Sequence, residues 1–148
     1  MIREGLVQSA HDCSEGGLAV TLAECCFNPE RLFGAEISVA RPSGSPKDES
    51  AVADLRGEED RKRDECATLF NESQSRIVIS VRPENLDNAI AMLRECKVPF
   101  HQLGRVASEE LRIRLYEDEF TWRIADLYDD WFYAIRRAVE QDESIPSL

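Results

Sequence analysis

Residues 9–17 read SAHDCSEGG and run directly into an apolar stretch, LAVTLAEC. Apolar side chains recur there at steps of three and four residues, which predicts a helix from about Ser14 to Cys26 with one buried face. The first turn of a helix leaves backbone N–H groups without partners inside the helix and carries a partial positive charge. The stretch is therefore a predicted helix start of a kind that attracts anions.

Two interpretations of this helix start follow from its residues, and the sequence leaves both open. In the first, Gly16 and Gly17 let a phosphate approach the backbone, and Ser14 either caps the helix or donates to the ligand. Asp12 would repel a bare phosphate, but Mg²⁺ takes carboxylate and phosphate oxygens in one octahedron. In the second, Ser14 is a plain N-cap, Glu15 complements the helix dipole and the glycines form a tight turn.

Further along the chain, alternating or β-branched apolar residues predict strands, and spacings of three to four residues predict helices. The expected strands are AEISVA (35–40), RIVISV (76–81), FHQLGRV (100–106) and LRIRLY (111–116). The expected helices are one within PENLDNAIAMLRECKV (83–98) and a last one from about Ile124 to Val139, whose single wide apolar face we expect to be core. Helices and strands in this uneven order predict a layered α+β domain.

The segment from Pro42 to about Glu65 has a different composition, rich in Pro, Gly, Ser and charged residues and poor in large apolar side chains. Such a segment buries too little surface to be held firmly. We therefore expect a mobile insertion at 42–65, with one or two solvated helical turns, inside a single domain that spans residues 1–148.

The composition excludes several classes of partner. The chain of 148 residues is 43% hydrophobic, enough for one domain with a core, and its 18 basic and 29 acidic side chains give a net charge of −11. This charge repels nucleic acids and anionic membranes, and no apolar run approaches the ~20 residues that span a bilayer.

The five cysteines lack the paired spacing of a disulfide framework or a zinc site. We expect a soluble cytoplasmic protein whose cysteines are small core residues.

A second polar motif, FNESQSR, precedes the expected strand at 76–81. Its residues Glu72, Ser73, Gln74 and Arg76 suit a binding loop, and a turn with satisfied hydrogen bonds explains them equally well. Elsewhere, Cys13 does not suit a thiol nucleophile, because neighbouring acidic residues disfavour its thiolate.

The stretches AHDCSEGGLAVTLAE, LFNESQSRIVISV and LGRV together resemble the C-terminal domain of the phosphoribosylformylglycinamidine synthase family. These glutamine-dependent ligases of purine biosynthesis belong to the superfamily of aminoimidazole ribonucleotide synthetase-like ATP enzymes. The resemblance implies a three-layer α/β/α domain with a mixed sheet related to the ferredoxin-like plait. It also implies that the chain corresponds to the last quarter of a longer enzyme, which converts formylglycinamide ribonucleotide, ATP and ammonia to the amidine.

The same resemblance implies roles for individual residues. Asp12 matches a magnesium-binding aspartate, and Ser14 matches a nucleotide-contacting serine, at a second, structural nucleotide site of the large family members. The residues ESQ at 72–74 match a loop that contacts substrate in the first half of the enzyme. The implied cofactors are ATP or ADP and Mg²⁺.

The implied partners are the N-terminal domains of the parent enzyme, a glutamine amidotransferase subunit or domain, and the ribonucleotide substrate. Most catalytic residues would lie on those other domains, so we expect the isolated chain to be inactive. Two alternatives stay open, namely a non-catalytic scaffold domain and the equivalent domain of another enzyme of the superfamily.

Overall fold

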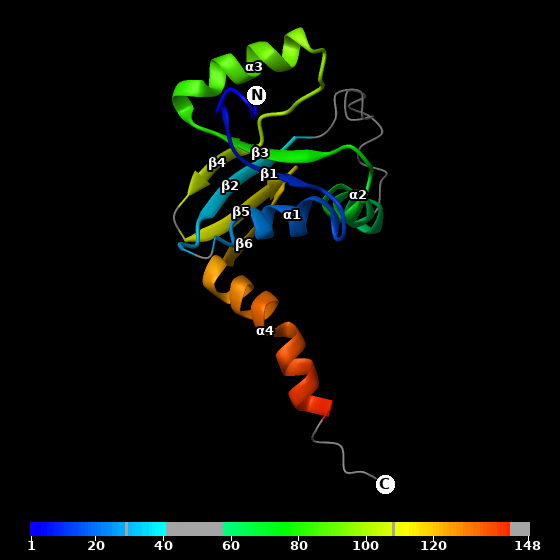
Figure 1. Ribbon diagram of the computed structural model, residues 1–148. Helices are drawn as coiled ribbons and strands as arrows, with labels where there is room; N and C mark the ends of the chain where they lie inside the picture. The colour runs from blue at the N-terminus through cyan, green and yellow to red at the C-terminus, as the bar shows by residue number, and fades with distance from the viewer. Residues whose placement is uncertain (29, 41–57, 108, 143–148) are drawn as a thin grey trace.

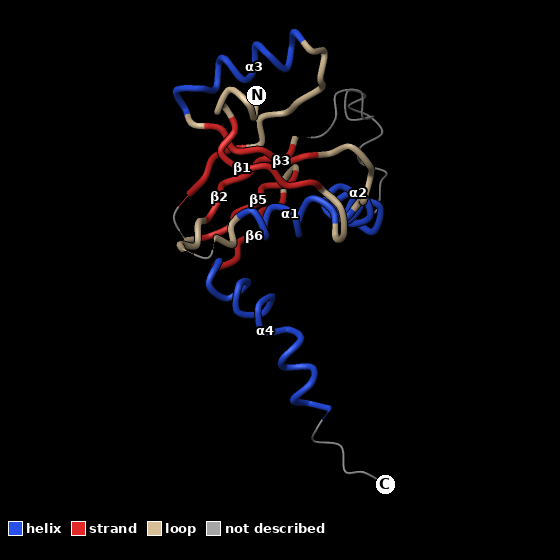
Figure 2. Tube along the Cα trace, viewed as in Figure 1, coloured by secondary structure: helices blue, strands red, loops and turns tan. Residues whose placement is uncertain are grey.

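The computed structural model describes residues 1–28, 30–40, 58–107 and 109–142 (Figure 1). In chain order the elements are β1 (Val7–Asp12), α1 (Gly17–Cys25), β2 (Gly34–Val39), α2 (Glu58–Phe70), β3 (Ile77–Val81), a 3₁₀ turn η3 (Pro83–Asn85), α3 (Leu86–Glu95), β4 (Gly104–Ala107), β5 (Glu110–Leu115), β6 (Asp118–Arg123) and α4 (Ile124–Asp142). This mixture of helices and strands confirms the predicted α+β class (Figure 2).

The strands form two sheets. A four-stranded mixed sheet has the order β4-β2-β5-β6, with β2 parallel to β5 and the other neighbours antiparallel. A separate two-stranded ribbon pairs β1 with β3 antiparallel, so that Asp12 lies opposite Ile77. In Figure 1 this ribbon lies between α3 on one side and α1 on the other, which agrees with the expected layering of helices around strands.

The hydrophobic core lies between α1 and one face of the four-stranded sheet. The alternation predicted at 111–116 is confirmed, because Leu111, Ile113 and Leu115 of β5 are fully buried and belong to the same core cluster as the apolar residues of α1. Burial of a leucine or isoleucine side chain contributes about 1.5–3 kcal/mol to folding. On the opposite face of β5, Arg112 and Arg114 form ion pairs with Glu119 of β6.

Helix α1 begins three residues later than the predicted start at Ser14. Gly16 and Gly17 have φ angles of +79° and +67°, so the chain is left-handed there and enters the right-handed helix only beyond them. Gly16 is the N-cap, and no side chain caps the helix. The interpretation of Ser14 as a plain N-cap is therefore wrong.

The predicted insertion at 42–65 falls partly on residues that the structure describes. Residues 41–57 lie outside the described part of the chain, while Glu58 to Glu65 form the first two turns of α2, a helix longer than the one or two turns expected. Two local effects favour a helix here. The acidic first turn complements the helix dipole, and Nζ of Lys62 forms an ion pair with Oε1 of Glu58, one turn away, at 2.7 Å.

Helix α4 confirms the predicted last helix but not its predicted buried face. Ile124, at its start, is 1% exposed, and Leu127 packs against the core. The later part of α4 projects away from the body of the domain (Figure 1), and Ile135 is 80% exposed. Only the first two turns of the apolar face are therefore core. Within the described ranges, no helix is long and apolar enough to cross a membrane.

Candidate functional site

The antiparallel pairing of β1 with β3 brings the two polar sequence motifs together. The N–H of Cys13 donates to the carbonyl of Arg76 at 2.9 Å, which extends the ribbon one step beyond the pair Asp12–Ile77. The turn after β1 and the loop before β3 therefore face each other across an open hollow of about 480 Å³. The hollow is lined by Asp12, Cys13, Ser14, Glu15, Glu72, Gln74, Ser75, Arg76 and Ile77.

Most of the site residues predicted from sequence line this hollow. Asp12 and Ser14 come from the first motif, and Glu72, Gln74 and Arg76 come from the second. The remaining three predicted residues, Ser73, Gly16 and Gly17, are not among its lining residues.

The start of α1 already has an anionic partner from the chain itself. The N–H of Gly16 donates to Oε1 of Glu72 at 3.0 Å, and the N–H of Gly17 donates to the Ser14 carbonyl at 3.3 Å. A carboxylate beside a helix N-terminus is stabilised by the partial positive charge there. A phosphate that used the Gly16 N–H would therefore have to displace Glu72.

Gly17 lies against the backbone of α2. A Cβ atom at Gly17 would lie 2.7 Å from the carbonyl carbon of Phe70 and 2.8 Å from the carbonyl oxygen of Leu69. Because those are backbone atoms of α2, they have little freedom to move aside. The close approach of α2 is by itself a reason for glycine at this position, and the role of Gly17 in phosphate binding stays a prediction.

The charges around the hollow favour an anionic ligand only if a cation binds together with it. Asp12, Glu15 and Glu72 contribute three carboxylates, against the single guanidinium of Arg76. That guanidinium donates to the Asn71 carbonyl, while its Nε atom is buried and has no hydrogen-bond partner. A bare phosphate meets net repulsion here, which a divalent cation would reverse.

Carboxylate oxygens have the right chemistry for Mg²⁺, but the protein alone does not supply a complete set of ligands. Among the described residues no three His, Cys, Asp or Glu side chains lie close enough to hold a metal ion. Mg²⁺ commonly binds through one or two carboxylates together with substrate phosphates and water. The donor set around Asp12 therefore fits a magnesium ion that arrives with a phosphate ligand.

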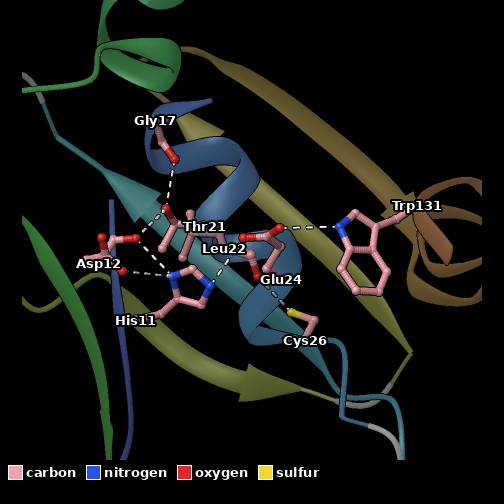
Figure 3. Close-up of polar contacts among 8 residues, drawn as sticks. All are labelled: His11, Asp12, Gly17, Thr21, Leu22, Glu24, Cys26 and Trp131. Atoms are coloured by element: carbon pink, nitrogen blue, oxygen red, sulfur yellow. Dashed lines mark hydrogen bonds and ion pairs between the residues drawn. The ribbon is translucent and has the colours of Figure 1, made fainter. Parts of the chain in front are cut away.

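A chain of polar contacts connects Asp12 to the last helix (Figure 3). Nδ1 of His11 lies 2.8 Å from the Asp12 carbonyl oxygen, and Nε2 lies 3.1 Å from Oε2 of Glu24. The other Glu24 oxygen, Oε1, accepts a hydrogen bond from the Trp131 indole at 3.3 Å. Sequence reasoning did not find Glu24 or Trp131, because these contacts cross between β1, α1 and α4 and leave no local pattern.

The buried thiol of Cys26 is a poor nucleophile at neutral pH. Burial, assisted by the neighbouring Cys25, raises the pKa of Cys26 to about 11, so its thiolate is scarce at neutral pH. Cys13 and Cys26 are buried core residues as expected, whereas Cys25, Cys66 and Cys96 are exposed, which the sequence did not predict; all five are free thiols.

Comparisons with known proteins identify the family of this chain. The family model "AIR synthase related protein, C-terminal domain" matches residues 1–115. The PurL subunit of phosphoribosylformylglycinamidine synthase from Anaeromyxobacter sp. (strain Fw109-5) is 34% identical over 141 residues, which cover 95% of this chain and 16% of that protein. The PurL subunit from Alkaliphilus metalliredigens (strain QYMF) is 36% identical over 115 residues, 78% of this chain and 13% of that protein. The chain thus spans about a sixth or less of the length of these relatives.

Solved structures show the same fold. T. maritima PurL complexed with FGAR superposes with a TM-score of 0.62 at 22% identity, covering 86% of this chain and 19% of that one. T. maritima PurL complexed with ATP gives a TM-score of 0.60 at 19% identity, covering 84% and 19%. The family model covers well over half of the chain, and the resemblance indicated by the HDCSEGG and NESQSR motifs is confirmed. The chain therefore belongs to the AIR synthase related protein C-terminal domain family.

Proposed function

We propose that this chain is a domain of an ATP-dependent phosphoribosylformylglycinamidine synthase of purine biosynthesis, and that the hollow between β1 and β3 binds a magnesium nucleotide. The observation that carries the proposal is the meeting of Asp12 and Ser14 with Gln74 and Arg76 in one hollow. The named relatives and the neighbouring structures complexed with FGAR, ATP and ADP support it.

In this proposal each lining residue has a chemical role. Asp12 supplies a carboxylate oxygen to Mg²⁺, and the exposed Ser14 hydroxyl donates to a phosphate oxygen. Arg76 brings the one positive side chain among the residues that line the hollow. Gln74 supplies amide donors and acceptors for a sugar or base. A Mg²⁺ ion held by Asp12 would supply positive charge, which would offset the carboxylates of the hollow and favour a phosphate there.

Glu72 has a different role from the other lining residues. Its carboxylate accepts a hydrogen bond from the Gly16 N–H, a backbone donor at the start of α1 that a phosphate could otherwise use. An incoming phosphate would exchange with this carboxylate, which could then face the metal instead. The net cost of the exchange is small because one charge-assisted hydrogen bond replaces another.

The ligase reaction itself requires more than this chain. An amidation driven by ATP needs a nucleotide and a ribonucleotide oriented against each other, and a single domain supplies one wall of such a cleft. We propose that the other domains of the parent enzyme and a glutamine amidotransferase subunit or domain complete it, in the cytoplasm. The isolated chain should show no turnover of formylglycinamide ribonucleotide with ATP and ammonia.

The binding proposal is tested by titrating the 148-residue chain with ADP, with and without Mg²⁺, while recording amide chemical shifts by NMR. We expect Mg²⁺-dependent shifts centred on Ser14, Gly16 and Gln74. Asp12→Asn should remove most of the magnesium dependence, whereas the matched control Asp87→Asn, on the exposed start of α3, should not. Absence of any Mg²⁺-dependent shift at these amides would refute the binding site.

A second candidate function, that of a scaffold domain without a ligand, is favoured by one observation. Glu72 already accepts the Gly16 N–H, so this backbone donor at the start of α1 is satisfied without a phosphate. In that case Glu72→Ala should destabilise the domain by about 1–2 kcal/mol and create no new binding. In the nucleotide proposal the same variant should also strengthen the binding of ADP in the absence of metal, because one repelling carboxylate is gone.

A further inference from the structure

Asp12 has an exposed side chain on a firmly held backbone. The side chain is 73% exposed, and its Oδ1 lies 4.0 Å from Nδ1 of His11. The main chain, by contrast, pairs with Ile77 in the ribbon, and its carbonyl oxygen lies 2.8 Å from His11 Nδ1 and 3.3 Å from the Thr21 hydroxyl. Contacts that fix this peptide fix the direction of the Asp12 Cα–Cβ bond, and therefore the region that its carboxylate can reach.

The His11 ring is held from both sides. It leaves β1 toward α1, where Nε2 meets Oε2 of Glu24 at 3.1 Å, while Nδ1 donates to the Asp12 carbonyl (Figure 3). His11 and Glu24 are both partly buried, with side chains 34% and 30% exposed. A ring with a partner at each nitrogen has little freedom to rotate about its side-chain bonds.

Glu24 is in turn held by α4. The Trp131 indole donates to Oε1 of Glu24 at 3.3 Å. The Trp131 ring packs against Phe27, 5.3 Å away between centroids, and against Tyr128, 6.1 Å away. The carboxylate of Glu24 therefore has one oxygen on the imidazole and the other on an indole that is itself packed.

We propose that His11 is a positioning residue for Asp12, and that Glu24, anchored by Trp131, holds the His11 ring in place. This inference rests on the proposed function, because it gives His11 a role only if Asp12 binds the metal. Groups that orient a metal ligand without touching the metal typically change metal affinity 10- to 100-fold when removed. In this proposal His11 orients Asp12 and does not touch the metal itself.

Two substitutions of similar size separate positioning from simple packing. In His11→Asn the amide nitrogen lies close to where Nδ1 lies in histidine, so the donor to the Asp12 carbonyl is kept. In His11→Gln the amide reaches toward Glu24 instead, and the donor to Asp12 is lost. Trp131→Phe keeps an aromatic ring beside Phe27 and removes only the N–H that Glu24 accepts.

The experiment measures the Mg²⁺ concentration that gives half of the ADP-induced NMR shift, at fixed ADP, for each variant of the 148-residue chain. His11→Gln should raise this concentration roughly 10-fold, and His11→Asn should stay within about 3-fold of the unmodified chain. Trp131→Phe should fall between the unmodified chain and His11→Asn, because it weakens the hold on Glu24 but keeps the contact between Glu24 and the His11 ring. Shifts produced by ADP without metal, and the melting temperature, should change little in His11→Gln.

Several outcomes contradict the proposal, and they are distinguishable. If Asp12→Asn removes the Mg²⁺ dependence while His11→Gln leaves it unchanged, the positioning role is wrong and the nucleotide site stands. If Asp12→Asn leaves the Mg²⁺ dependence intact, both proposals fall. If His11→Gln weakens ADP equally with and without metal and lowers the melting temperature, His11 is structural and the positioning role is again wrong.

Discussion

Replacing Gly17 by alanine should destabilise the domain strongly, and the structure gives the magnitude. Two costs add. Gly17 has φ = +67°, where an alanine costs about 1–2 kcal/mol. Its new Cβ would also lie 2.7–2.8 Å from backbone atoms of Leu69 and Phe70 in α2, and relief of such overpacking typically costs 1–3 kcal/mol. We therefore expect a loss of roughly 2–5 kcal/mol, a large share of the stability of an ordinary domain.

Gly5 provides a matched control for this prediction. Its φ angle, +69°, is nearly the same, but an added Cβ would meet no atom within 4 Å. Gly5→Ala should therefore cost only the conformational part, about 1–2 kcal/mol.

The assay is urea unfolding followed by far-UV circular dichroism, with the free energy of unfolding extrapolated linearly to water. Gly17→Ala should be less stable than Gly5→Ala by about 1–3 kcal/mol, or should fail to fold where Gly5→Ala folds. Equal stabilities within about 0.5 kcal/mol would refute the reasoning, because they would show that α2 does not press on Gly17.

Three further predictions concern separate features. Ser14→Ala should change the free energy of unfolding by less than about 0.5 kcal/mol in urea, because Ser14 caps nothing, and a loss of about 1 kcal/mol would restore the N-cap interpretation. Ile135→Lys should lower the free energy of unfolding by less than about 0.5 kcal/mol, because the Ile135 side chain is 80% exposed. Ile124→Ala should lower it by roughly 2–5 kcal/mol, because Ile124 is 1% exposed. Similar losses in the two variants would mean that α4 is buried along its length. At pH 8 a thiol reagent should label the exposed Cys96 long before the buried Cys26, because the pKa of Cys26, about 11, keeps its thiol protonated until the pH approaches that value. Comparable labelling rates of the two cysteines, measured by mass spectrometry, would contradict this prediction.

Local patterning predicts β5, which buries one face cleanly, and fails for two strands that are mostly exposed. The alternation in LRIRLY identifies β5 because Leu111, Ile113 and Leu115 all point into the core. Strands β1 and β6 escape prediction, because VQSAHD and DEFTWR are mostly polar and mostly exposed. They are strands because β3 and β5 offer them hydrogen-bonding edges, and such pairing joins distant segments.

The residue types of the candidate site could be predicted from the sequence, but its geometry could not. Nothing in the local pattern shows that Asp12 and Arg76 border the same hollow, since this follows from the antiparallel register of β1 with β3. The bond between Glu72 and the Gly16 N–H has the same origin. The motif resemblance named the participants, and the ribbon determines which of them meet.

Helix α4 shows a different limit of sequence patterns. Its apolar residues recur with helical spacing from Ile124 to Val139, and periodicity specifies that such residues share a face. It does not specify what that face packs against. The first turns meet the core at Leu127, whereas Trp131 keeps one polar contact, to Glu24, and leaves half of its surface exposed. A helix with one apolar face can therefore serve two environments in succession, and only the three-dimensional structure locates the boundary between them.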